Sequence, residues 1–407
     1  MYLRLEILLD KDVLLKYWGT DNRRNNMWYM NEEREQLKKM AHDFTQEEVK
    51  PFVKEMEEKN AFPHEILKKA AELGITGLIF PESCDGFGPN WVDFGICLEE
   101  IGKESDCVAN ALCSQYAATS IMAMIPDQKR IDTIVKPVVH GEFVLATAQC
   151  EPAGQTMLEH MGTHFDWDYT NNQVVINGGK IFCTNAGNAE YYLVTCKTPE
   201  PIQEPMGKFT YILVHKDTPG FQVGHIENKI GWHGSSTGQL YFNDCRVSTE
   251  NIVASFDMNG ETTYFGGCNI GVLMAAGALG GAEGVFEKAL NYAKERKQGD
   301  KSLFESYQAM RFKFAELYME IESLRGLVYG VLDDLDKGSQ DVTARAWAAK
   351  LKGAEVFEHV ASECIVLFGG NGIIVENGIE RYLRDAKMNA IGCFALPHIS
   401  DMIGSHL

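Results

Sequence analysis

The sequence has few basic residues, no long hydrophobic run and no internal repeat. Its 38 lysines and arginines are outnumbered by 57 aspartates and glutamates, which gives a net charge of −19 at pH 7. Nucleic acids and anionic lipids bind basic surfaces, so we expect neither as the main partner. The longest apolar stretch, residues 271–282, is shorter than the ~18 residues of a membrane-spanning helix. We therefore expect no membrane span.

Paired cysteine motifs are also missing. The eleven cysteines are scattered along 407 residues without a C-x-x-C pair or the spacing of a zinc site. In a chain of this length, the pattern favours free thiols in a reducing cytoplasm over a disulfide scaffold, and we expect no bound metal. Residues 1–18 contain an apolar patch that Asp and Lys interrupt, which makes a poor signal peptide. We interpret residues 1–29 as an N-terminal extension.

What the sequence does contain is a hydrophobic period that changes twice along the chain. Residues 30–139 place apolar side chains three and four apart, which predicts helices. Residues 140–255 consist of short β-branched and aromatic runs between turns, with Asn177-Gly178 as a hairpin signal. Residues 256–407 return to long helical segments that predict a four-helix bundle. We expect a mainly α protein with a central antiparallel β-domain.

Six short strings lie on these segments. They are Cys150-Glu-Pro, Gly179-Lys-Ile-Phe-Cys-Thr-Asn185, Ile230-Gly-Trp-His-Gly-Ser235, Ala293-Lys-Glu-Arg-Lys297, Phe368-Gly-Gly-Asn-Gly372 and Arg381-Tyr-Leu-Arg-Asp-Ala-Lys387. One string alone is weak, because a glycine pair such as Gly369-Gly370 usually marks the end of a helix. All six in this order, on these element types, make residues 30–403 resemble the acyl-CoA dehydrogenase family.

The resemblance implies an N-terminal helical domain, a middle β-barrel and a C-terminal bundle, assembled as a homotetramer or as a hetero-tetramer with a paralogue. It implies FAD between barrel and bundle, partly held by a neighbouring subunit, an acyl-CoA substrate beside it, and an electron-transfer flavoprotein as partner. The implied reaction is α,β-oxidation of the acyl-CoA. A base removes the α-proton, flavin N5 accepts hydride from Cβ, and donors stabilise the thioester oxygen.

The resemblance also implies a set of cofactor-binding residues. Thr184 matches a threonine at the flavin edge, Phe182 stands where a tryptophan packs on the ring, and Arg296 matches an arginine on the partner's FAD diphosphate. The full set is Cys150, Thr156, Phe182, Cys183, Thr184, Arg296, Gln308, Val366, Gly369 and Gly370.

Several of these positions depart from the family pattern. Cys150 replaces a threonine, and a thiol is a weak donor. Val366 replaces a glutamine, which removes one polar contact. Simpler interpretations stay open: Phe182 and Thr184 fit ordinary strand alternation, and Arg296 fits a solvated cation at a helix end.

The largest departure is the catalytic base. Cys393 stands where the family commonly has a glutamate, and Ala395 where it has a threonine. Some members carry the base on the first bundle helix instead. This sequence has Ile270 at that position, followed by Gly271, so neither position holds a carboxylate. A thiol has a pKa near ~8.5 that apolar burial raises, so Cys393 makes a doubtful base. Glu261 is a less favoured candidate.

Two functions therefore compete. One is an FAD-dependent flavoenzyme on acyl-CoA, with ordinary or altered base chemistry. The other is a degenerate, non-catalytic structural subunit that pairs with an active acyl-CoA dehydrogenase.

Overall fold

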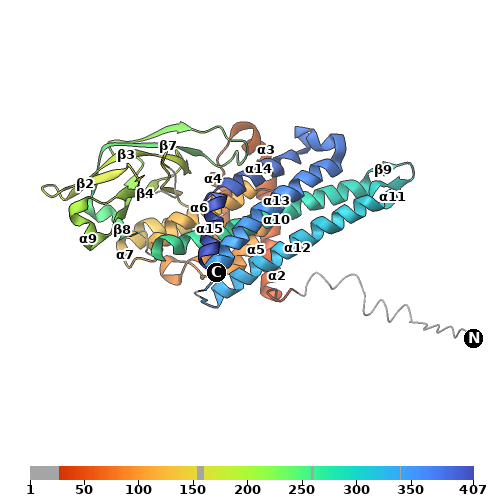
Figure 1. The fold of residues 1–407 in the computed structure, drawn as a ribbon, viewed down its shortest axis with the longest axis horizontal. Helices are drawn as coiled ribbons and strands as arrows, with labels where there is room; N and C mark the ends of the chain where they lie inside the picture. Colours follow the sequence, from red (N-terminus) through yellow and green to blue (C-terminus); the bar gives the residue numbers. More distant parts are fainter. Residues whose placement is uncertain (1–26, 154–159, 258–260, 340) are drawn as a thin grey trace, which may run out of the picture.

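The structure is a computed structural model that describes residues 27–153, 160–257, 261–339 and 341–407. The chain runs from a group of helices, through a β-sheet at one end of the molecule, into long helices that extend to the opposite end (Figure 1). This confirms the predicted fold class, mainly helical with a central β-domain.

The N-terminal helices begin with a well-capped α2. Asn31 accepts a hydrogen bond from the N–H of Arg34, and three glutamates occupy the first turn, where the helix dipole favours negative charge. The series is α2 (Glu32–Phe44), α3 (Lys50–Lys59), α4 (His64–Glu72), α5 (Trp91–Gly102), α6 (Asp106–Ala123), α7 (Gln128–Arg130) and α8 (Lys136–Val139), with π turns at Thr45–Val49 and Ile131–Val135 and 3₁₀ turns at Thr76–Ile79 and Glu82–Cys84. Just before α2, buried Tyr29 stacks on Tyr329 with ring centroids 3.8 Å apart.

Eight strands form the central sheet. They are β1 (Leu145–Ala148), β2 (His164–Asp168), β3 (Gln173–Thr184), β4 (Tyr191–Lys197), β5 (Phe209–His215), β6 (Phe221–Ile226), β7 (Thr237–Ser248) and β8 (Ile252–Phe256), with α9 (Gln203–Met206) between β4 and β5 and 3₁₀ turns at Glu200–Ile202 and Thr249–Asn251. Their order is β6-β7-β3-β2-β4-β5-β8, with β1 beside β4. Most neighbours are antiparallel as predicted, but β1 and β2 both run parallel to β4. β1 and β2 pair with β4 and not with each other, so no hairpin joins them.

The C-terminal helices pack around a buried central helix, α10. The series is α10 (Glu261–Glu295), α11 (Leu303–Ser306), α12 (Gln308–Asp336), α13 (Thr343–Phe368), α14 (Glu380–Ile391) and α15 (Leu396–Ser405), with 3₁₀ turns at Gly369–Ile373 and Val375–Asn377 and a hairpin of β9 (Lys297–Gln298) and β10 (Lys301–Ser302). Asn269–Glu295 of α10 is long and apolar enough to cross a membrane, but 83% of its most apolar window is buried by protein. Its hydrophobicity is therefore explained by packing inside the fold.

Glycines allow α10 to approach α5 closely. A Cβ on Gly280 would lie 2.0 Å from the Glu99 carbonyl oxygen, and one on Gly284 would lie 2.1 Å from that of Lys103. On the facing helix, a Cβ on Gly102 would lie 2.4 Å from the carbonyl oxygen of Gly277. These distances are far below van der Waals contact, so the crossing of the two helices requires residues without side chains.

We therefore expect Gly280→Ala to destabilise the protein by about 1–3 kcal/mol, because the added methyl group forces two backbones apart. Gly326→Ala is the matched control, since Gly326 lies on α12 with nothing within 4 Å of its Cβ position. That change is expected to stabilise by up to about 1 kcal/mol through helix propensity. Urea unfolding of both variants measures the difference, and equal effects would contradict the close approach.

Trp232, in the loop between β6 and β7, connects the sheet to both groups of helices. Its backbone N–H donates to Asp385 on α14 at 2.8 Å, and its indole N–H donates to Asp106 on α6 at 2.9 Å. Both carboxylates are buried. Because these bonds join three segments distant in sequence, they fix the β6–β7 loop against α14 and α6.

Candidate active site

A buried ion pair holds the turn that follows β1. The Lys180 ammonium donates to Glu151 at 2.7 Å, and Glu151 also accepts from the N–H groups of Gly162 and Thr163. Burial alone would raise the pKa of the Glu151 carboxyl, but Lys180 and the N–H donors hold it below its usual range. The pair places half-buried Cys150, whose carbonyl accepts from the N–H of Ile181, beside the end of β3.

We expect Lys180→Met to lower the free energy of unfolding by about 2–3 kcal/mol, because it removes a charged hydrogen bond and leaves a buried carboxylate without its cation. The matched control is Lys216→Met, which breaks the half-exposed pair between Lys216 and Glu190 and is expected to cost much less, because solvent screens that pair. Urea titration measures both. Equal costs would show that the buried pair is no stronger than a surface one.

The end of β3 presents alternating side chains to the surface and to the core. The pairing of β3 with β7 is irregular between Lys180 and Cys183, and Phe182 there has φ = 52° and is 61% exposed. Cys183 is buried in the sheet core, where its thiol donates to the Thr147 carbonyl at 3.5 Å. Half-buried Thr184 pairs with Thr237 at the strand end. Phe182 and Thr184 are thus open to a ligand, whereas Cys183 faces inward.

A second group of predicted residues lies at the far end of the long helices. Arg296 follows the last residue of α10, Gln308 begins α12, and both are exposed. Val366 is 71% exposed near the end of α13, and Gly369 and Gly370 have nothing within 4 Å of their Cβ positions. Figure 1 shows β9 and α11, which lie between Arg296 and Gln308, at the opposite end of the molecule from the sheet. One chain therefore does not bring its two groups of residues together.

Cys393 lies between α14 and α15, at the junction of helices and sheet. Gly392 beside it is close to the Trp232 ring, and Cys393 has φ = 76°. Burial raises the pKa of the Cys393 thiol to about 12, although the charge of Lys350 acts in the opposite direction. The thiol is therefore protonated at neutral pH. Nearby His398 lies against the Phe394 ring.

The alternative base positions hold no carboxylate either. Ile270 is half-buried, and a Cβ on Gly271 would lie 3.2 Å from the Trp347 ring, so a longer side chain at Gly271 would displace that ring. The side chain of Glu261 lies outside the described residues, as does Thr156. Among the described residues, no group of three or more His, Cys, Asp and Glu side chains could hold a metal ion.

Lys350 was not among the predicted site residues. This residue of α13 is fully buried, and its ammonium donates to the carbonyl and, at 3.3 Å, to the side-chain oxygen of Asn389. Burial lowers its pKa to about 8. The sequence does contain a signal for it, because a lysine stands on the apolar face of the predicted helix, between Ala346 and Gly353.

The described residues have the chemistry that FAD requires. Phe182 exposes an aromatic ring at an irregular strand end, and half-buried Thr184 follows two residues later on the same strand. Arg296 forms no ion pair with the described residues, so its guanidinium is available for a diphosphate. Gly369 has φ = 59° and bare backbone next to it, which permits close approach of a phosphate. We conclude that these residues fit the cofactor.

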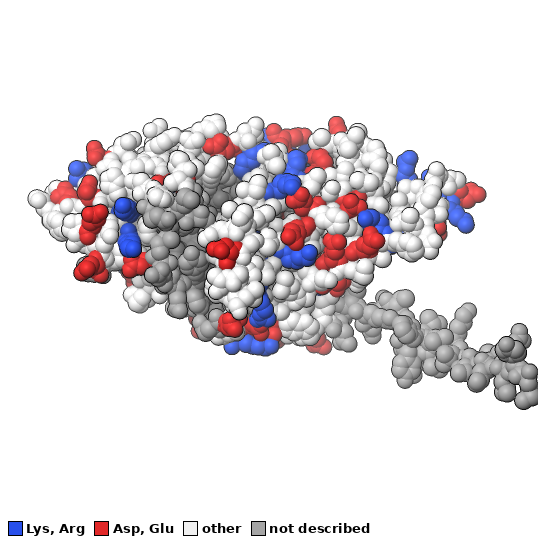
Figure 2. Space-filling model, viewed as in Figure 1, with Lys and Arg blue, Asp and Glu red and all other residues white. Residues whose placement is uncertain are grey.

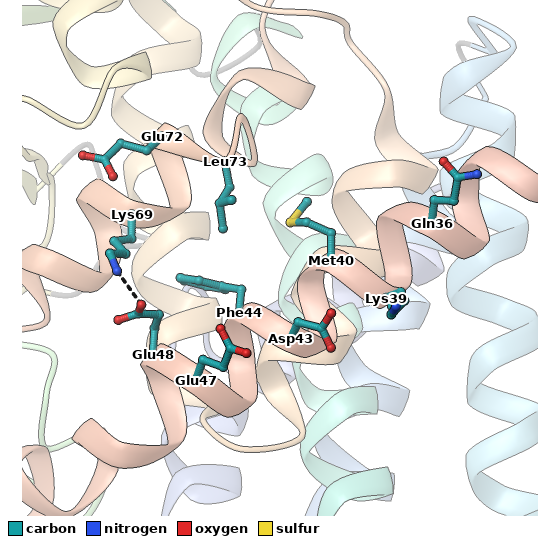
Figure 3. A pocket seen from close by; sticks show the side chains of 10 residues that line it. All are labelled: Gln36, Lys39, Met40, Asp43, Phe44, Glu47, Glu48, Lys69, Glu72 and Leu73. Atoms are coloured by element: carbon teal, nitrogen blue, oxygen red, sulfur yellow. Dashed lines mark hydrogen bonds and ion pairs between the residues drawn. The ribbon is translucent and has the colours of Figure 1, made fainter.

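The molecule also has a pocket away from these groups. A hollow of about 480 Å³ lies between α2 and α4 and is lined by Phe44 and Met40, among others, with Lys69 paired to Glu48 at its edge (Figure 3). None of the predicted site residues lines it. On the face in Figure 2, acidic and basic side chains are interspersed over the helices, with no broad basic patch.

Three family models match the chain in order. They are the N-terminal domain of acyl-CoA dehydrogenase over residues 31–140, the middle domain over 146–245 and the C-terminal domain over 271–393. Together they cover most of the chain.

Individual relatives agree with these models. A short-chain-specific acyl-CoA dehydrogenase of Clostridium acetobutylicum is 33% identical over 89% of this chain and 94% of its own length. Butyryl-CoA dehydrogenase of Megasphaera elsdenii has a similar structure, with 28% identity, a TM-score of 0.86 and coverage of 93% of this chain and 99% of its own. A chain in a structure concerning the electron transferring flavoprotein of Acidaminococcus fermentans matches equally well, with 28% identity, a TM-score of 0.86 and 93% and 98% coverage.

Members of this family are FAD-dependent flavoproteins, and the exposed residues at the sheet end and at the bundle end fit that cofactor. From the matched domains, the shared fold and these residues, we conclude that this chain belongs to the acyl-CoA dehydrogenase family of flavoprotein oxidoreductases.

Proposed function

We propose that this protein oxidises a short-chain acyl-CoA thioester at Cα–Cβ, at a site that lacks the usual carboxylate base. The proposal rests on Cys393. Its thiol is protonated, and its backbone N–H has no acceptor among the described residues. That N–H supplies a donor for the thioester oxygen. When bound, FAD supplies the acceptor for hydride from Cβ.

Each remaining residue has a proposed role. Phe182 covers the flavin ring, Thr184 donates to its edge, and Cys150 lies beside it with a weakened donor. Arg296 and Gln308 contact the cofactor of a neighbouring subunit, which is consistent with their distance from the sheet in one chain. Val366, Gly369 and Gly370 form the adjoining surface.

The substrate must compensate for the missing base. Positions 393, 270 and 271 hold no carboxylate, so none of the three supplies the usual base for the α-proton. We therefore propose a short-chain thioester whose α-proton is unusually acidic. The short-chain-specific and butyryl-CoA relatives support the chain length.

We further propose a tetramer in the cytoplasm that passes electrons to an electron-transfer flavoprotein. Ten described cysteines are free, which is consistent with a reducing compartment. The similarity to a chain in the Acidaminococcus fermentans structure supports the partner.

A second function is favoured by the same substitutions. A non-catalytic subunit paired with an active dehydrogenase would retain such features: a protonated Cys393 thiol, a weak donor at Cys150 and a blocked position at Gly271.

Purification under anaerobic conditions distinguishes the two functions. The enzyme is expected to show flavin absorbance at about 450 nm that bleaches with butyryl-CoA or with a thioester of higher α-acidity. A protein that retains no FAD after reconstitution would contradict both the cofactor assignment and the reaction. A flavin-loaded protein that no thioester bleaches, but that co-purifies with an active paralogue, would favour the structural subunit.

A further inference from the structure

We propose that Lys350 is a positioning residue for the thioester. Its ammonium donates to the backbone carbonyl of Asn389, which would otherwise accept from the N–H of Cys393. The inference rests on the proposed function, since the thioester oxygen is the group that this N–H would bind. Lys350 itself reaches neither substrate nor cofactor, because it is fully buried.

At the end of α14, the Lys350 ammonium takes the place of a backbone N–H donor. In a continuing helix, the N–H of Cys393 would donate to the carbonyl four residues earlier, that of Asn389. The preceding bond is made, because Gly392 donates to Met388 at 2.8 Å. At Gly392 the backbone then becomes extended, and Cys393 takes φ = 76°, so the chain leaves the helix.

Leaving the helix creates a buried carbonyl that needs a donor. Asn389 is 1% exposed, and a buried carbonyl without a partner costs about 1–3 kcal/mol. Lys350, reaching across from α13, donates to this oxygen. The helix end is therefore satisfied without Cys393.

The N–H of Cys393 is left free as a result. No acceptor for it is found among the described residues, whereas the next N–H, that of Phe394, donates to Gly392 at 3.2 Å. Cys393 is half-buried at the junction of sheet and helices, between the exposed Ile391 and the core. A free N–H in this position can donate to a ligand oxygen without breaking a helix bond.

The surroundings of Lys350 indicate a specific requirement for a donor. It packs beside Gly271 and Trp347 in an apolar layer, where burial of an ammonium is costly and a methionine would fill the same space. The Asn389 amide donates to Asp106 at 3.3 Å, which fixes the acceptor in place. A long side chain with a terminal donor is required to reach from α13 to the Asn389 carbonyl on α14.

Isotope-edited infrared spectroscopy tests the inference without relying on turnover. The probe is crotonyl-CoA labelled with heavy carbon at the thioester carbonyl, bound to the FAD-loaded protein. Binding is expected to lower the carbonyl stretching frequency, because the N–H polarises the bond. Lys350→Met is expected to bind the probe and lose most of this shift. The control Lys352→Met, at an exposed position on the same helix, is expected to keep it.

The outcomes separate the inference from the function. A full shift in folded Lys350→Met, or no shift in the unmodified protein despite binding, overturns the inference and leaves the function standing. A flavin-free protein that binds no crotonyl-CoA overturns both. If Lys350→Met does not fold, Lys350→Gln replaces it. This variant is expected to lose part of the frequency shift, and a full shift would overturn the inference. If neither folds, amide hydrogen exchange at Cys393 must slow when the probe binds, and unchanged exchange overturns the inference.

Discussion

Replacing Cys393 by glutamate is expected to raise the rate of acyl-CoA dehydrogenation by roughly 10²–10⁴-fold, the usual contribution of a positioned base. Burial raises the pKa of the Cys393 thiol to about 12, so almost no thiolate is present at neutral pH. A carboxylate has a much lower unperturbed pKa, about 4.3, and the adjacent positive charge of Lys350 opposes the rise that burial at this position causes. The rate of anaerobic flavin bleaching by butyryl-CoA measures the gain.

Cys393→Gln is the matched control, because it adds a side chain of the same shape that cannot accept the α-proton. It is expected to leave the rate near that of the unmodified protein. A gain in both variants would mean that size, and not basicity, limits the reaction. No gain in folded, flavin-loaded Cys393→Glu would show that the missing carboxylate is not the limiting feature.

The fold could be predicted from the sequence because its signals are local. The switch from helical to alternating hydrophobicity near His140, and back near Glu261, marks the three segments, and the six strings add the family. The parallel pairing of β1 and β2 with β4 was missed, because it joins strands that are not consecutive in the sequence. The hydrophobic period of a segment carries no information on which distant strand it pairs with.

The candidate site was less predictable. Its ten cofactor residues came from the resemblance, and the structure places the nine that it describes in two groups, one at the sheet end and another at the bundle end. Burial of the Cys183 side chain and the positive φ of Phe182 depend on the irregular pairing of β3 with β7. Lys350 was missed because a lysine in a helical pattern normally lies in solvent, and its partner Asn389 is 39 residues away.

Arg325→Met is expected to lower the free energy of unfolding by about 3–5 kcal/mol, because it leaves buried carboxylates without their cation. Arg325 on α12 is buried, pairs with Glu99 on α5 and with Glu283 on α10 at 3.0 Å, and so joins three helices. Tyr329 donates to the same Glu99. Burial raises the pKa of Glu99, so removal of the guanidinium would favour protonation of this carboxyl and recover part of the loss.

The cost of Arg325→Met should depend on pH through Glu283. Burial opposes its ionisation, but Arg325 and Lys103 lower its pKa from 4.5 to about 2. A carboxyl with a depressed pKa in the folded state contributes stability that is complete above its unfolded pKa and is lost as the pH falls toward the folded one. The difference between Arg325→Met and the unmodified protein should therefore be largest at neutral pH and shrink below about pH 4.5.

Urea unfolding at several pH values, at equal protein and FAD concentrations, measures this dependence. Arg345→Met is the control, because Arg345 forms a half-exposed pair with Asp334 and is expected to cost less than about 1 kcal/mol. If both variants lose the same stability, or if the Arg325→Met difference does not change with pH, the buried ions are not what holds these helices together. Association of α5, α10 and α12 would then rest on apolar contacts and on the close approach that Gly280 and Gly284 permit.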